Sequence, residues 1–289
     1  MESLEFLLPH IRLSSLQYHS QNSEIVTIAL HGWLDNASSF SPLMAVNNNH
    51  HVMAIDWSGH GHSQHRGVDV SYQLLDYVYD LYALIEHHQW QKVNIIGHSL
   101  GAIVASIFTG TFPELVNKLV LIEALGAISS KPQETRELLK KSIVNRYREQ
   151  TKESSNKRYS SFEKAVLART MASDFNSDIA KILVERSLLA TDDGFKWRSD
   201  PRLKQLSPMR MVEQQALDLL SGIEHETLLI LGENGYLSLR KTLRERMAVM
   251  PNLNVHTLAG GHHLHMEHPE PVWQLITQHL FIPVANEST

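Results

Sequence analysis

Cysteine is absent from this sequence of 289 residues. Its absence excludes disulfide bridges, a thiol nucleophile and thiolate metal sites, and it favours a reducing compartment. The sequence also lacks any run near the roughly 18 apolar residues that a membrane helix needs. Glu2 and Glu5 stand where a secretory signal would carry positive charge. We therefore expect a cytoplasmic protein without a membrane anchor.

Charge of neither sign is in large excess. The 31 acidic and 26 basic side chains leave a net charge of −5, which is no general reason to expect nucleic acid or an anionic membrane as partner. Apolar residues make up 43% of the chain, enough to bury a substantial core. The length suits one large domain or two smaller ones, and the composition favours a soluble protein.

Short apolar runs recur along the chain and are separated by helical patterns. The runs cover residues 25–30, 52–55, 93–96, 119–122, 228–231 and 255–258. Residues 71–88 and 271–281 carry apolar side chains at three- and four-residue spacing, as amphipathic helices do. Alternation of apolar strands with such helices predicts an α/β fold with a mostly parallel central sheet, flanked by helices on both faces.

One segment interrupts this alternation. Residues 131–170 contain 16 charged side chains, 11 basic and 5 acidic, and show no clear strand. Further helical patterns follow before strands resume at Thr227. We expect a helical lid over 127–215, inserted into an α/β core formed by 1–126 and 216–289. Its basic bias is typical of a solvated helix surface. An electropositive lid that attracts anionic substrates is the alternative.

The segment Gly97-His98-Ser99-Leu100-Gly101 lies between an apolar, β-branched run and an apolar stretch compatible with a helix. A serine at a sharp strand-to-helix turn has a strained backbone that lifts its hydroxyl clear of the sheet, and flanking glycines let strand and helix pack closely. The N-terminus of the new helix favours developing negative charge there. We therefore identify Ser99 as the candidate nucleophile; a glycine-flanked loop is the alternative.

Two N–H donors aimed at one point would be needed for an oxyanion hole. The N–H of Leu100, directly after the candidate nucleophile, is expected to supply one. The first apolar run ends in His31-Gly32-Trp33 at the carboxyl edge of the predicted sheet, where open α/β folds bind ligands. We expect the Trp33 N–H to be the second donor, with Gly32 allowing the backbone to turn inward. A plain turn with a packed tryptophan is the alternative.

Four histidines follow the last predicted strand, at positions 262, 263, 265 and 268. An imidazole can accept the serine proton and return it at neutral pH, and this place in the chain puts a histidine on the same sheet edge as Ser99. The residues alone leave the choice among the four open. The pairs His50-His51 and His87-His88 have no acidic or cysteine neighbours at ligand spacing, so no metal site is expected.

Four motifs are spread over the predicted core: HGW at 31–33, DWSGHGHS at 56–63, GHSLG at 97–101 and GHHLHMEHP at 261–269. Together they resemble the lidded α/β hydrolases, in particular the serine-hydrolase-like proteins and more distantly the haloalkane dehalogenases. In this family the catalytic histidine follows a glycine and precedes Glu-x-Pro, which selects His262. The dehalogenases have an aspartate nucleophile where Ser99 stands, so dehalogenation is disfavoured. Asp56 is expected to fix its glycine-rich loop rather than to catalyse.

The third catalytic member departs from the pattern that the resemblance implies. Most of the family has a Gly-x-x-Asp loop after the penultimate strand, but here the loop reads Gly232-Glu233-Asn234-Gly235, with Gly235 in the Asp position. Glu123 ends the run 119–122 at the carboxyl edge of the sheet, as a Glu does in some dehalogenases. We expect Glu123 to be the triad acid. Glu233 is the alternative, and Glu123 would then be a solvent-facing strand end.

These assignments predict a serine hydrolase that cleaves a carboxylic ester of a small or medium substrate through an acyl-enzyme, with no cofactor. The expected triad is Ser99, His262 and Glu123. Candidates for the substrate pocket are His31, Trp57 and His98. A C–C bond hydrolase or amidase with the same triad, a cofactor-free perhydrolase and a non-catalytic ligand-binding protein on this scaffold are the alternatives. The vacant acid position is the only support for the last of these.

Overall fold

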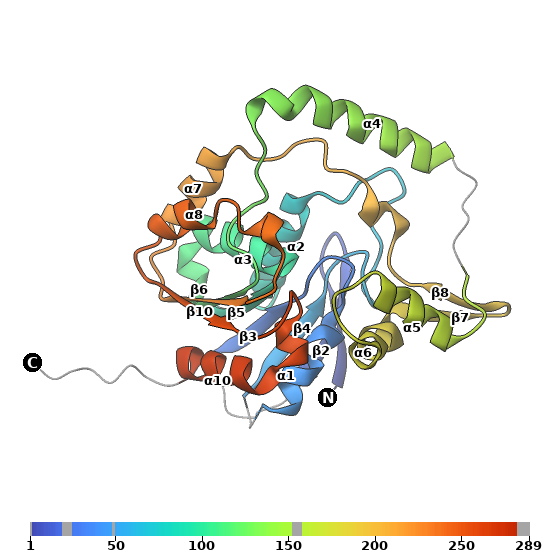
Figure 1. The fold of residues 1–289 in the computed structure, drawn as a ribbon, viewed down its shortest axis with the longest axis horizontal. Coiled ribbons are helices and arrows are strands. Elements are labelled where there is room, and N and C mark those ends of the chain that lie inside the picture. Colours follow the sequence, from blue (N-terminus) through green and yellow to red (C-terminus); the bar gives the residue numbers. More distant parts are fainter. Residues whose placement is uncertain (1, 19–24, 48–49, 152–157, 282–289) are drawn as a thin grey trace, which may run out of the picture.

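The central sheet has eight strands in the order β1-β2-β4-β3-β5-β6-β9-β10 (Figure 1). The computed structural model describes residues 2–18, 25–47, 50–151 and 158–281. The strands are β1 (Glu2–Leu7), β2 (Arg12–Tyr18), β3 (Val26–Leu30), β4 (Val52–Asp56), β5 (Val93–His98), β6 (Val116–Ile122), β9 (Thr227–Gly232) and β10 (Leu253–Leu258). Only the β1–β2 and β2–β4 pairs of this sheet are antiparallel. The expected mostly parallel sheet is confirmed.

Helices cover both faces of this sheet (Figure 1). Their bounds are α1 (Ser41–Ala45), α2 (Leu74–His87), α3 (Leu100–Thr111), α7 (Glu213–Ser221), α8 (Leu243–Ala248), α9 (Leu264–Glu267) and α10 (Pro269–Leu280). Single turns of 3₁₀ helix lie at Ala37–Phe40, Pro113–Leu115, Pro132–Glu134, Pro201–Lys204 and Leu237–Leu239.

Alternate residues of the strands belong to two separate apolar clusters, because successive side chains of a strand point to opposite faces. Leu119 and Leu121 of β6 pack in the cluster that contains α2, α3 and α7. Val120 and Ile122 pack in the cluster that contains α1 and α10. The apolar runs of the sequence are continuous because both faces of these strands are buried.

All six apolar runs are strands, and the two amphipathic patterns are the helices α2 and α10. The pattern at 71–88 begins as a helix only at Leu74, because Gln73 and Asp76 form a capping arrangement there. Strands β1 and β2 were not predicted from the sequence. β1 is an edge strand in which only Phe6 is buried, so its hydrophobic signal is weak.

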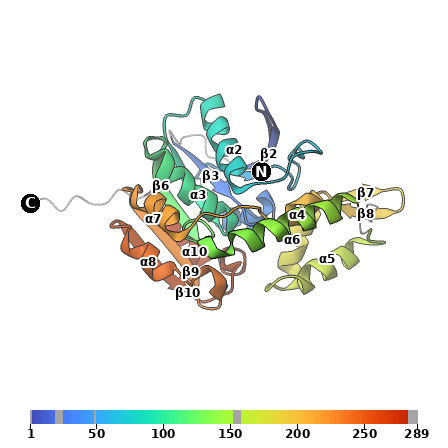
Figure 2. The ribbon, with the colours of Figure 1, turned by 90° about the horizontal axis from the view of Figure 1, so that it is seen from above.

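Between β6 and β9 the chain leaves the core and forms an inserted segment. It contains α4 (Thr135–Thr151), α5 (Phe162–Met171), α6 (Ser177–Ser187) and a hairpin of β7 (Leu188–Thr191) and β8 (Gly194–Trp197). The hairpin was not expected from the sequence. Helices α5 and α6 share an apolar cluster with β7. Helix α4 runs from the side of α7 towards this hairpin in both views (Figures 1 and 2).

None of the described helices is long and apolar enough to cross a membrane. The parallel strands β5, β6, β9 and β10 bring their carboxyl ends to the same edge of the sheet. The segments that follow β5, β6 and β10 carry Ser99, Glu123 and His262. The topology therefore gathers these three residues at one edge.

Candidate active site

Ser99 stands between the end of β5 and the start of α3 in a backbone conformation that L residues rarely adopt, with φ 51° and ψ −110°. The turn needs both flanking glycines. A Cβ at Gly97 would lie 2.6 Å from Ala102 Cα, and one at Gly101 would overlap the carbonyl oxygen of Leu30. The Ser99 N–H donates to the Ile122 carbonyl at 2.9 Å, which anchors the turn to β6.

The structure brings the three expected triad residues together. His262 Nε2 lies 2.9 Å from Ser99 Oγ, and His262 Nδ1 lies 3.1 Å from Glu123 Oε2. A carboxylate only accepts, so Nδ1 carries the imidazole proton and Nε2 is free to accept from the serine hydroxyl. His262 and Glu123 are buried, with 4% and 2% of their surface exposed, so bulk water does not compete strongly for these hydrogen bonds.

The Glu123 carboxylate is held in its ionised form. Burial alone would raise its pKa, but hydrogen bonds from His262 and from the Gly232 N–H, together with the charge of Arg240, outweigh burial and lower the pKa. The Gly232 N–H donates to Oε1 at 2.6 Å, and Arg240 Nη2 donates to the same oxygen at 3.0 Å. Glu123 itself has a positive φ of 66°, and its N–H donates to the Ile230 carbonyl of β9.

Gly235 is vacant as an acid position because the Glu123 carboxylate fills that space. A Cβ on Gly235 would lie 2.5 Å from the Glu123 carboxyl carbon and from Arg240 Nη2. The side chain of Glu233, the alternative acid, belongs to an exposed residue of the same loop. The carboxylate that faces His262 Nδ1 therefore comes from the strand next to β9 rather than from the loop after β9.

Leu100 is the first residue of α3, so its N–H has no acceptor within the helix and points out of the helix N-terminus. In the loop after β3, the Leu34 N–H donates to His60 Nε2 and the Asp35 N–H donates to the Gly32 carbonyl. The Trp33 N–H directly precedes these two groups in the loop and remains the candidate for the second oxyanion donor. The Trp33 indole is half exposed and donates to the Leu203 carbonyl of the inserted segment at 3.0 Å.

The pocket interpretation of His31, Trp57 and His98 is corrected by their burial, since none of the three exposes any surface. His31 Nδ1 donates to the Gly32 carbonyl, its Nε2 accepts from the Trp57 N–H, and the Trp57 indole donates to the His31 carbonyl. His98 Nε2 donates to the His262 carbonyl at 2.8 Å. These side chains support the loops of the site from beneath.

Several side chains around the site gave no signal in the sequence. Tyr236 stacks on the His262 ring, with centroids 4.0 Å apart and planes 12° apart, and its pKa is raised by burial. Arg240 follows Gly235 by five residues and contacts Glu123. Neither residue belongs to a recognisable motif. The hint in the sequence was Glu123 itself: a carboxylate that ends an apolar strand without a basic neighbour in the sequence needs a cation from elsewhere in the fold.

Buried ion pairs join the inserted segment to the loops of the core. Asp56 accepts from the backbone N–H groups of Ala37 and His62, and it pairs with Arg186 of α6 at 2.7 Å. The expectation that Asp56 fixes its loop agrees with these contacts. Arg169 of α5 pairs in the same way with the buried carboxylate of Asp35.

Among the described residues, Asp35, His98 and His263 form a group whose donor atoms lie within 4.8 Å of one another. Three such ligands can hold a metal ion only if the imidazoles are neutral. Asp35 and Asp174 outweigh the effect of burial and raise the pKa of His263 to about 9, so its ring nitrogens carry protons at neutral pH. This group is an ion-pair cluster in the structure.

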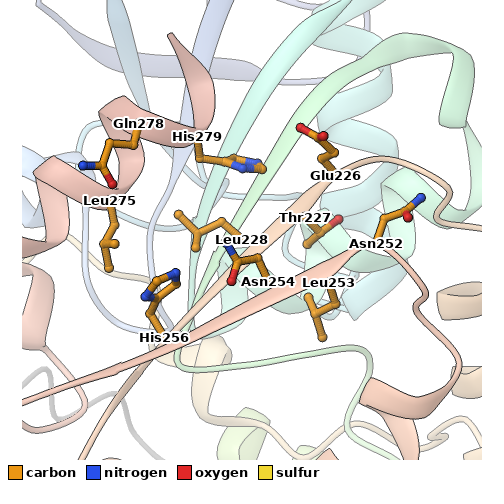
Figure 3. Close-up of a pocket in the computed structure, with 10 residues that line it drawn as sticks. All are labelled: Glu226, Thr227, Leu228, Asn252, Leu253, Asn254, His256, Leu275, Gln278 and His279. Carbon is orange, nitrogen blue, oxygen red and sulfur yellow. The ribbon is translucent and has the colours of Figure 1, made fainter. Parts of the chain in front are cut away.

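A hollow lined by residues of β9, β10 and α10 lies away from these residues (Figure 3). Thr227 and Leu253 on its wall are the first residues of β9 and β10, whereas Ser99, Glu123 and His262 follow the carboxyl ends of their strands. The hollow is therefore at the opposite edge of the sheet from the candidate triad.

Comparison with known proteins agrees with this fold. Residues 28–269 match the family described as alpha/beta hydrolase fold. A serine hydrolase-like protein of Danio rerio is 30% identical over 267 residues, which are 88% of this chain and 80% of that protein. Serine hydrolase-like protein 2 of Homo sapiens is 27% identical over 270 residues, 88% of this chain and 86% of that protein.

A solved structure of a hypothetical protein from Pseudomonas aeruginosa PAO1 is also similar, with a TM-score of 0.87 and 34% identity over 96% of this chain and 98% of that chain. The family match covers most of the chain, and the relatives and the structure span nearly all of it. The chain therefore belongs to the alpha/beta hydrolase fold family and is a hydrolase of that fold.

Proposed function

We propose that this protein is a serine hydrolase that cleaves carboxylic esters of small or medium substrates through an acyl-enzyme. One observation carries the proposal. The Ser99 hydroxyl, the His262 imidazole and the Glu123 carboxylate form a continuous line of hydrogen bonds, with 2.9 Å and 3.1 Å between successive heavy atoms. Nucleophilic acyl transfer needs a hydroxyl, a base and an orienting group in this order. Similarity to serine hydrolase-like proteins supports the proposal.

In the first half of the reaction, Ser99 Oγ bonds to the acyl carbon while its proton passes to His262 Nε2. The carbonyl electron pair moves onto oxygen, and the N–H groups of Leu100 and Trp33 stabilise that oxyanion. Glu123 stabilises the imidazolium that has formed. Collapse of the intermediate restores the carbonyl and expels the alcohol, which takes the proton from His262.

In the second half, a water molecule gives a proton to His262 and attacks the acyl carbon. The second tetrahedral intermediate collapses, the bond between Ser99 Oγ and the acyl carbon breaks, and Oγ recovers its proton from His262. One ester and one water are converted into an acid and an alcohol. The line of hydrogen bonds therefore serves both halves with the same atoms.

A serine-directed fluorophosphonate followed by peptide mapping tests the nucleophile, and p-nitrophenyl esters of graded chain length test the reaction. We expect one label per chain, on Ser99, and loss of esterase activity. Ser99→Ala should lose on the order of 10⁶ in kcat, as on removal of a nucleophile in another serine hydrolase. The control variant Ser221→Ala changes an exposed serine at the end of α7 and should keep full activity.

Labelling at another serine, or an active Ser99→Ala variant, would contradict the proposal. Turnover of amides or of activated C–C bonds without turnover of esters would keep the triad but change the substrate class. Peroxide-dependent halogenation in acetate would indicate a perhydrolase, and binding without turnover would indicate a ligand-binding protein. A small-molecule ester as partner and a cytoplasmic location stay predictions.

A further inference from the structure

A second histidine, His263, lies between two carboxylates directly beside the candidate base. Its Nδ1 is 2.8 Å from Asp174 Oδ1, and its Nε2 is 3.3 Å from Asp35 Oδ2. His263 and Asp35 are buried, with 5% and 3% of their surface exposed. Both ring nitrogens face acceptors, so both must donate, and the ring must carry a positive charge. The catalytic scheme above does not use this imidazolium.

The cluster around His263 joins three parts of the chain. Asp35 belongs to the loop after β3, His263 follows His262, and Asp174 lies between α5 and α6 of the inserted segment. Arg169 of α5 adds a second cation, paired with Asp35. Two carboxylates and two cations therefore balance one another inside the protein.

The same cluster holds the backbone of His262. Asp174 Oδ2 accepts from the His262 N–H at 2.7 Å, while His98 donates to the His262 carbonyl at 2.8 Å. His98 in turn has its Nδ1 3.8 Å from Asp35 Oδ2. The peptide groups on both sides of the candidate base are thus tied to the cluster, and one of the ties comes from the inserted segment.

The charged groups that act on His263 lie on different segments of the chain packed against its ring. Asp35 and Asp174 raise its pKa to about 9 against the opposing effect of burial. Asp174 has its own pKa lowered to about 2, because the bonds and charge from His263 outweigh burial. The neighbouring rings of His98 and His265 have pKa values lowered by burial and then by nearby imidazoles. The cation of this group of histidines is therefore His263.

We propose that His263 is a positioning residue for the hydrolase reaction. Its imidazolium, clamped by Asp35 and Asp174, fixes the position of His262 and the charge around it, and links His262 and His263 to the inserted segment. The proposal rests on the proposed function, because it concerns the base of that reaction. The His262 and His263 rings are 5.3 Å apart between centroids, so a charge on one acts directly on the other.

Two substitutions should move the acid limb of the pH profile of kcat/KM in opposite directions. His263→Gln removes a positive charge beside His262, which makes protonation of His262 easier and should move the limb up by about one pH unit. Asp174→Asn removes a negative charge, keeps an oxygen that can accept from the His262 N–H, and should move the limb down by a similar amount. We expect Asp35, whose charge contributes most to the raised pKa of His263, to keep that ring protonated at the pH of this limb.

Matched variants separate charge from structure. The double variant His263→Gln with Asp35→Asn restores the charge balance and should return the limb to within a few tenths of a pH unit of its original position. His268→Gln changes an exposed histidine five residues away and should leave the profile unchanged. Fluorophosphonate labelling of Ser99 counts the competent sites in each variant. A displacement of the limb in the same direction in both single variants, or no displacement in either, would overturn the proposal even if activity fell.

A readout without catalysis covers the case in which esters are not turned over, or in which His263→Gln does not fold. Imidazole NMR signals of isotopically labelled histidine should include one ring that stays protonated well above pH 8. That signal should be absent from His263→Asn or His263→Gln, and its titration should move to lower pH in Asp35→Asn. If no such ring exists in the native protein, the proposal is wrong whatever the enzyme does.

Discussion

Adding one methyl group at Gly235 should disable the enzyme although Gly235 takes no part in the reaction. In Gly235→Ala the new Cβ would lie 2.5 Å from the Glu123 carboxyl carbon, whereas two carbon atoms in contact need about 3.5 Å. The loop cannot simply withdraw, because the Gly235 N–H donates to the Gly232 carbonyl and the Asn234 N–H donates to the Gly260 carbonyl. The carboxylate must therefore move by about 1 Å.

Such a movement would break the 3.1 Å hydrogen bond between Glu123 Oε2 and His262 Nδ1. A misplacement of about 1 Å costs on the order of 10² in rate, and loss of the orienting carboxylate in a serine protease costs about 10⁴. We expect kcat of Gly235→Ala to fall by about 10² to 10⁴, equivalent to roughly 3–5 kcal/mol of activation free energy.

The assay is ester hydrolysis under saturating substrate, with thermal unfolding and circular dichroism to show that the variant is folded. Gly67→Ala is the matched control, because the nearest atom to its Cβ would be the movable Asp69 carboxylate at 3.1 Å. The double variant Glu123→Ala with Gly235→Asp should recover part of the activity that Glu123→Ala loses, because the new aspartate takes the space that the Glu123 carboxylate has vacated. Glu123→Gln with Gly235→Asp should not, since glutamine fills that space as glutamate does. A Gly235→Ala enzyme with more than half the native kcat would refute the reasoning.

Three further predictions follow from the same contacts. Glu123→Gln should lower kcat by about 10² to 10⁴ with little change in melting temperature, while Glu233→Gln should cost less than about tenfold; stopped assays on both variants compare them. Arg240→Gln should lower kcat more than it changes KM, because the Glu123 carboxylate loses a hydrogen-bond donor. Arg240→Lys should recover part of that loss in kcat. Because the pKa of His263 is raised in the folded protein, protonation of its ring contributes to stability. This contribution is fully present below pH 6.5, the ordinary pKa of the group, and is lost as pH rises through about 9. Denaturant unfolding from pH 6 to 9.5 should therefore show a loss of about 3 kcal/mol that His263→Gln lacks; equal slopes in both proteins would count against a charged His263.

The local elements of this protein could be read from the sequence. Six apolar runs are strands because parallel strands buried on both faces need continuous apolar side chains. The turn at Ser99 was recognisable because the two glycines that it needs lie within two residues of the serine. Any side chain there would collide with Ala102 or Leu30. His262 was selected by the family motif around it, since four histidines in seven positions carry no such information by themselves.

Tertiary structure decided which charged groups meet. Glu123 faces His262 because β6 lies beside β9 in the sheet, and its carboxylate, with Arg240, fills the space above Gly235. Its place at a strand end and the family resemblance made Glu123 the expected acid, but only the fold brings Glu123 and His262 into contact across 139 positions of sequence. For the same reason the sequence could not show that His31, Trp57 and His98 are buried beneath the site rather than exposed within it.

The clamp on His263 is the clearest case of what the fold alone determines. Asp174 is 89 positions from His263, and it lies in the inserted segment, four residues beyond the charged stretch 131–170, where no motif marks it. Burial then changes the chemistry of the ring: between two carboxylates and away from water, an imidazole that would be neutral at pH 7.5 keeps its proton. Sequence determined which groups were available at the carboxyl edge of the sheet, and packing determined their partners and their charge.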